Sequence, residues 1–186
     1  MKKLSLVVAS PYFEKVHYAF VMATGAAAIG APVTMFFTMS ACPAILKDPD
    51  WRILPSEKPG MTAAARDQAF TANGVAGLDE LIDSAVELGI TFMICEMGLR
   101  AEALEDAPLR DGLAAERTGV VTFFNDAGLT EATGSSNIVY VPAAHRAAMP
   151  GFAAVTFKAF GHVIATRVAQ RRHGRCGSDG THAGTA

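Results

Sequence analysis

The stretch LDELIDSAVELGITFMIC, residues 78–95, contains two periodicities in succession and decides the fold class. In its first part, apolar residues recur every three or four positions with acids between them, and a glycine follows, which predicts a helix over Leu78–Gly89. Its second part, Ile90–Cys95, is a short, almost wholly apolar run that is typical of a strand buried on both faces. A helix that leads directly into a buried strand is the repeating unit of an α/β protein.

Three other segments continue this alternation. Apolar runs predict strands over Leu4–Ser10, Pro32–Met39 and Asn137–Val141, and a helix over about Tyr12–Ile29 joins the first two. Strands that alternate with helices imply right-handed crossovers and a parallel sheet. We therefore predict a single-domain α/β protein, an open parallel sheet with helices on both faces and a flavodoxin-like outline.

The remaining segments carry weaker patterns. Proline-rich residues 40–77 predict an irregular excursion with short helical pieces near Ala44 and Ala63. Short helices are predicted over Leu99–Glu105 and Val120–Ala132. The α/β domain is thus expected to span residues 1–141. A basic helical extension follows over 142–174, with its helix at Phe152–Arg172, and the small, polar residues 175–186 are predicted to be a disordered tail.

Composition limits the kinds of protein this sequence can encode. The 186 residues are 51% hydrophobic and 18% charged, enough for one well-buried core. No apolar run is long enough for a membrane span and the N-terminus lacks a signal-peptide pattern, so a cytoplasmic protein is expected. The body to Val141 is acidic and the residues after it are basic, which argues against nucleic acid as the main partner.

Cys95 is the principal candidate for chemistry. It ends a predicted parallel strand, and ligands and reactive groups collect beyond the carboxyl ends of such strands. The free N–H groups of a helix beginning near Gly98 would favour a thiolate, and Arg100 could add positive charge. Gly98 and Arg100, with Ser10, are therefore the candidate pocket residues. The alternative is a core cysteine that acts as a small apolar residue, because free cysteine is among the most buried residue types.

Other candidates have weaker support. Cys42 follows the second predicted strand and would be a secondary thiol if the two strand ends are close; otherwise it is a shielded loop cysteine. Ser10 could cap the first helix or face a ligand. The glycines of residues 25–31 end a helix and form no dinucleotide motif. His173, Cys176 and His182 lack a fourth donor at a usual spacing, so no metal site is predicted.

Two blocks of the sequence resemble a known family. GAAAIGAPVTMFFTM at residues 25–39 and LDELIDSAVELGITFMICEMGL at residues 78–99 are similar to the DsrE/DsrF-like sulfurtransferase family, in particular its peroxiredoxin-like branch. The resemblance implies a homo-oligomeric α/β protein whose strand-end cysteine, here Cys95, accepts sulfane sulfur as a persulfide. It also implies transfer to or from a thiol-containing partner protein, without a cofactor. Ser40 to Cys42 depart from the family pattern, which has an aromatic residue there.

Two hypotheses about function follow. In the first, the protein is a sulfur carrier or sulfurtransferase acting through Cys95, a chemistry that needs an accessible nucleophilic sulfur and no fixed base. In the second, it is a noncatalytic small-ligand-binding or scaffold module whose basic C-terminal helix docks on a partner or a membrane surface. The same helix could instead pack on the body or on another subunit.

Overall fold

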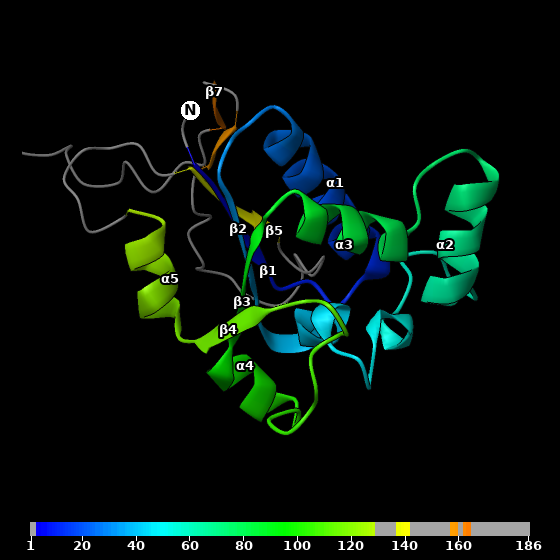
Figure 1. The fold of residues 1–186 in the computed structure, drawn as a ribbon. Helices are drawn as coiled ribbons and strands as arrows, with labels where there is room; N and C mark the ends of the chain where they lie inside the picture. The colour runs from blue at the N-terminus through cyan, green and yellow to red at the C-terminus, as the bar shows by residue number, and fades with distance from the viewer. Residues whose placement is uncertain (1–2, 129–136, 142–156, 160–161, 165–186) are drawn as a thin grey trace, which may run out of the picture.

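A parallel five-stranded sheet forms the centre of the molecule (Figure 1). The structure, a computed structural model, describes residues 3–128, 137–141, 157–159 and 162–164. The strand order is β4-β3-β2-β1-β5, and all neighbours are parallel. The strands are β1 (Leu4–Val8), β2 (Val33–Phe37), β3 (Thr91–Cys95), β4 (Ala115–Thr118) and β5 (Asn137–Val141). The predicted α/β class with a parallel sheet is confirmed.

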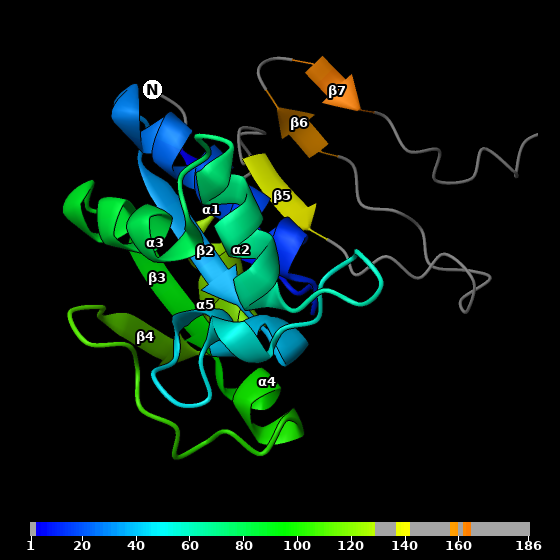
Figure 2. The ribbon, with the colours of Figure 1, turned by 90° about the vertical axis from the view of Figure 1, so that its right-hand side faces the viewer.

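Helices cover both faces of this sheet. Helices α1 (Phe13–Ala28) and α3 (Leu78–Glu87) lie on one face, and α5 (Val120–Asp126) lies on the other (Figures 1 and 2). From β1 to β4 the chain adds each strand on the same side, and after β4 it returns to place β5 on the far side of β1. Because parallel crossovers are right-handed, this reversal of direction carries α5 to the opposite face.

The main core lies between the sheet and the α1/α3 layer. The apolar positions that predicted α3 are its buried ones, Leu78, Leu81, Ile82 and Ala85. All five residues of β2 are buried, as expected for a central strand. Both helices are followed by a glycine in the left-handed region, Gly30 after α1 and Gly89 after α3, a conformation that ends a helix without a Cβ penalty.

The excursion predicted over residues 40–77 is irregular, as expected, with the 3₁₀ helices η1 (Met39–Ile45) and η2 (Trp51–Ile53) and the helix α2 (Ala63–Ala72). Partly buried carboxylates attach it to the body. The Glu14 carboxylate accepts hydrogen bonds from the Ser56 hydroxyl at 2.6 Å and from the Glu57 N–H at 2.8 Å. Asp79 of α3 accepts one from the Trp51 indole at 2.9 Å.

The prediction differs from the structure at the sheet edge and beyond it. Strand β4 was not expected, because its sequence, Ala-Glu-Arg-Thr, is charged, as edge strands often are. The helix expected over Leu99–Glu105 is α4 (Glu96–Ala101), which begins earlier because Cys95 is its N-cap. Helix α5 ends at Asp126, and residues 129–132 of its expected range lie outside the described residues.

The C-terminal helix predicted over Phe152–Arg172 is wrong where the structure describes that range. Strands β6 (Phe157–Ala159) and β7 (His162–Ile164) form an antiparallel pair there, with Phe157 opposite Ile164. Aromatic and β-branched residues favour strands, and cross-strand pairing outweighed the helical spacing. The rest of this helix and the tail predicted at 175–186 lie outside the described residues. No helix in the described part of the chain is long and apolar enough to cross a membrane.

Candidate functional site

Cys95 lies at the last position of β3 and is the N-cap residue of α4. Its Sγ accepts a hydrogen bond from the Gly98 N–H at 3.4 Å, so the sulfur is directed at the first turn of the helix. The residue is only 2% exposed. The carboxyl-end position expected from the sequence is therefore present, together with nearly complete burial.

The Cys95 side chain is on the α5 face of the sheet. Side chains alternate along a strand, so Met93 shares this face and Ile94 points to the opposite one. A small buried cluster forms here, separate from the main core, and consists of Phe36, Met93, Cys95 and Phe123. The rings of Phe36 and Phe123 are stacked, with centroids 4.9 Å apart and an interplanar angle of 16°. The thiol is thus enclosed by two strands and α5.

Gly98 permits a close approach of α4 to the end of β2. A Cβ at this position would lie 2.5 Å from the Met39 backbone nitrogen and 3.0 Å from the Thr38 Oγ1. Met39 itself has a φ of 51°, a conformation that costs a non-glycine residue free energy. The sequence predicted Gly98 as a pocket residue; in the structure it is buried in this contact and allows α4 to begin directly beneath Cys95.

Cys42 is fully buried in η1. Burial, together with the neighbouring charges of Cys95 and Glu102, raises the pKa of its thiol to about 12. Strands β2 and β3 are adjacent in the sheet, which brings η1 and α4 to the same edge. The two predicted thiols are therefore close enough to interact electrostatically, and Cys42 is the one held firmly in its protonated form.

Ser10 and His17 have structural contacts. The Ser10 Oγ is buried and accepts a hydrogen bond from the N–H of Tyr12, the residue that precedes the first turn of α1. A nitrogen of the His17 ring lies 2.8 Å from the Ala76 carbonyl oxygen. These contacts stabilise the start of α1 and hold the segment that precedes α3 against α1. Within the described residues, no group of histidine, cysteine and acidic side chains is arranged to hold a metal ion.

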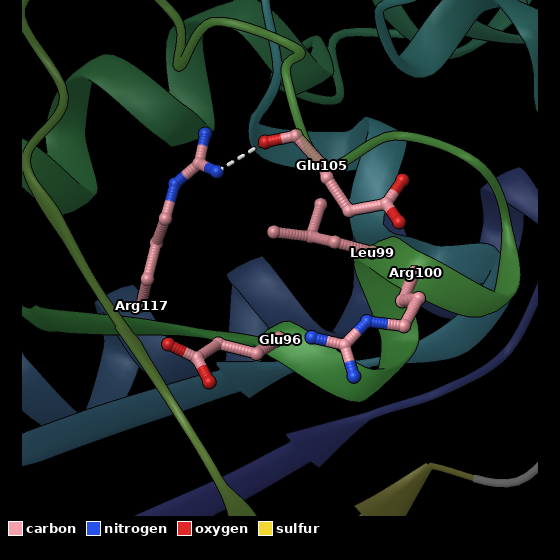
Figure 3. A pocket seen from close by; sticks show the side chains of 5 residues that line it. All are labelled: Glu96, Leu99, Arg100, Glu105 and Arg117. Atoms are coloured by element: carbon pink, nitrogen blue, oxygen red, sulfur yellow. Dashed lines mark hydrogen bonds between the residues drawn. The ribbon is translucent and has the colours of Figure 1, made fainter.

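Arg100 lines a pocket of about 210 Å³ beyond β3 and β4, together with Glu96, Leu99, Glu105 and Arg117 (Figure 3). The Arg117 guanidinium donates to the backbone carbonyls of Glu105 and Ala107. Arg117 is paired with Ile94 in the sheet register, so it extends to the face opposite the Cys95 sulfur. The pocket that Arg100 lines and the Cys95 sulfur thus lie on different sides of the end of β3.

A second, more apolar pocket of about 380 Å³ lies beyond the carboxyl ends of β1 and β2. Prolines form much of its wall, and at one end the Ser40 hydroxyl donates to a Glu102 carboxylate oxygen at 2.8 Å. Neither Cys95 nor Cys42 lines this pocket.

Sequence reasoning missed the residues that enclose the thiol. Period-two alternation along β3 was a signal that could have placed Met93 beside Cys95. Phe36 could then have been found from the pairing of β2 with β3. No sequence signal identified Phe123, because the face that α5 covers depends on the strand order.

Comparison with known proteins finds a DsrE protein that this chain resembles at low sequence identity. No protein-family model matches the chain. The chain is 25% identical over 150 residues to the sulfur carrier protein DsrE2 of Allochromatium vinosum, a match that covers 68% of this chain and 93% of that protein. The crystal structure of the ychN protein from E. coli aligns with a TM-score of 0.46 and 15% identity, over 75% of this chain and 99% of that one.

Proposed function

We propose that this protein is a sulfur carrier that holds sulfane sulfur as a persulfide on Cys95. The observation that carries the proposal is the position of this thiol, at the carboxyl end of a central parallel strand with its sulfur directed at the first turn of α4. Similarity to a protein named as a sulfur carrier supports the same role.

The chemistry requires one nucleophilic sulfur. The Cys95 thiolate attacks the outer sulfur of a donor persulfide, R–S–SH, and forms a new S–S bond as the donor's S–S bond breaks. The donor leaves as R–S⁻, and Cys95 becomes Cys–S–SH, so atoms and charge balance without an external oxidant or cofactor. Attack by an acceptor thiolate on the outer sulfur of the Cys95 persulfide reverses the process and delivers the sulfur.

The proposal also covers the partner proteins, the oligomeric state, the cellular location and the roles of two segments of the chain. Donor and acceptor are thiol-containing proteins, and the protein acts as a homo-oligomer in the cytoplasm, within the peroxiredoxin-like branch of the family. The α/β domain of residues 1–141 carries the sulfur. The basic residues 142–174 form a separate extension for contact with the acidic body, another subunit or an anionic surface.

The burial of Cys95 favours a second candidate, a noncatalytic small-ligand-binding module. In this alternative the proline-lined pocket near Ser40 and Glu102 holds the ligand and the thiol is part of the core. Such a module predicts no sulfur on Cys95 under any loading condition.

Intact-mass measurement after incubation with inorganic polysulfide separates the two candidates. We expect peptide-resolved spectra to place the added sulfur on the Cys95 peptide in the wild type and in Cys42→Ser, and to show its loss on treatment with dithiothreitol. Cys95→Ser should gain less sulfur than the wild type. An unmodified wild type, under conditions that load a control carrier, would overturn the proposal in favour of the binding module.

A further inference from the structure

A sulfur carrier needs its thiol to meet a second sulfur atom, and Cys95 is closed to solvent. It is 2% exposed, and neither described pocket includes it. On the α5 face of the sheet it is packed within a cluster of four buried residues that is separate from the main core. Exchange at this sulfur therefore requires a local opening of the structure.

Phe123 of α5 closes this cluster from outside the sheet. Its side chain is fully buried, stacks on Phe36 and is the only buried residue of the helix, Val120–Asp126. On the opposite face, by contrast, α1 buries six side chains. Among the described helices, α1 and α3 lie on one face of the sheet and α5 lies on the other (Figure 1). Since apolar stabilisation scales with the area buried, separating α5 from the sheet costs far less than separating α1.

Among the described residues, polar contacts at the far end of α5 are also few. The Lys3 ammonium pairs with an Asp126 carboxylate oxygen at 2.6 Å and donates to the Asp126 carbonyl at 3.2 Å. The other carboxylate oxygen of Asp126 is buried and has no hydrogen-bond partner in the part of the chain that the structure describes. The ion-paired side chains are about one-third exposed, so water and salt weaken their attraction.

We propose that α5 is a cover over Cys95 and that Phe123 controls access to the thiol. Displacement of Phe123 from Phe36 exposes Sγ while the main core between the sheet and α1 stays closed. The inference rests on the proposed sulfur-carrying role for its biological purpose, and it limits exchange to partners that reach the α5 face. The opening itself is measurable without any sulfur donor.

The test is the rate at which iodoacetamide alkylates each cysteine in the folded full-length protein. Cys42, Cys95 and Cys176 fall in different tryptic peptides, so mass spectrometry resolves them. Where closing is faster than labelling, the rate follows the population of the open form. We expect Phe123→Ala to raise the Cys95 rate about tenfold or more. Val121→Ala, an exposed position on the same helix, is the matched control and should leave the rate unchanged.

Cys42 distinguishes local from global opening, because it is fully buried in η1 and is not part of the cluster under Phe123. The proposal predicts that its rate stays at the wild-type value in Phe123→Ala. Lys3→Gln is a milder variant that keeps the aromatic stack. By weakening the attachment of α5, it should raise the alkylation rate of Cys95 a few-fold. An unchanged Cys95 rate in both variants, or parallel increases at Cys42 and Cys95, would overturn the inference while leaving the sulfur-loading result intact.

Discussion

Gly98→Ala tests the close approach on which the geometry of Cys95 depends. The added Cβ would lie 2.5 Å from the Met39 nitrogen and 3.2 Å from the Thr38 carbonyl carbon, both backbone atoms that cannot rotate away. Overpacking of this kind costs about 1–3 kcal/mol, and the better helix propensity of alanine returns up to about 1 kcal/mol. We expect a net loss of about 2 kcal/mol and a Tm lower by about 4–8 °C.

Gly25→Ala is the matched control, because Gly25 lies inside α1 and nothing lies within 4 Å of the added Cβ. This substitution should stabilise the protein by about 0.5–1 kcal/mol through helix propensity. Urea unfolding followed by the fluorescence of Trp51, the one tryptophan of the sequence, reports both changes. If Gly98→Ala were as stable as Gly25→Ala, the contact between α4 and the end of β2 would be refuted.

Two further predictions concern polar side chains. Burial raises the pKa of Asp79, but hydrogen bonds from Trp51 and Arg110 outweigh it and the pKa is lowered, so its carboxylate stabilises the fold above the unfolded value of about 3.9 and ceases to do so as the pH falls through the folded value. Asp79→Asn should lose about 1 kcal/mol at pH 7, a modest figure because the carboxylate is partly exposed. The deficit in urea unfolding should shrink as the pH falls below the unfolded value and through the folded one, whereas a pH-independent deficit would contradict the assignment. The Thr34 hydroxyl is buried and has no hydrogen-bond partner among the described residues, so Thr34→Val should stabilise the protein by about 1 kcal/mol in the same assay. Destabilisation would indicate a partner for this hydroxyl.

The fold class could be predicted because the strongest periodicities in the sequence coincide with the elements that make the core. Leu78–Gly89 and Ile90–Cys95 became α3 and β3 almost without change, since both segments bury the residues that define their patterns. The strand order could not be predicted, because the position of β5 beside β1 depends on contacts between segments far apart in the chain. Edge strand β4 is short and charged and carried no apolar signal.

The candidate site was predicted only in part, because some of its features depend on contacts between segments far apart in the chain. Placement of Cys95 at a strand end is a local property, readable from the apolar run that precedes it. Its burial under Phe123 is a tertiary property. The role of Gly98 also depends on a distant segment, because the obstacle to a side chain there is the backbone at Thr38 and Met39. A sequence pattern that indicates a glycine near a thiol does not distinguish a pocket from a contact between backbones.

One feature of the topology determines how a partner can approach the sulfur. Alternation along β3 directs Ile94 to the α1/α3 face and Cys95 to the other, so the charged pocket of Arg100 and Arg117 is separated from Sγ by the strand itself. The return of the chain from β4 to β5 puts α5 on the Cys95 face. Under the proposal that α5 covers Cys95, a reagent that binds among the pocket's charges has no direct path to the thiol, whereas one that displaces α5 does. Under the proposed function, transfer should depend more on Phe123 and its contacts than on the arginines of the pocket.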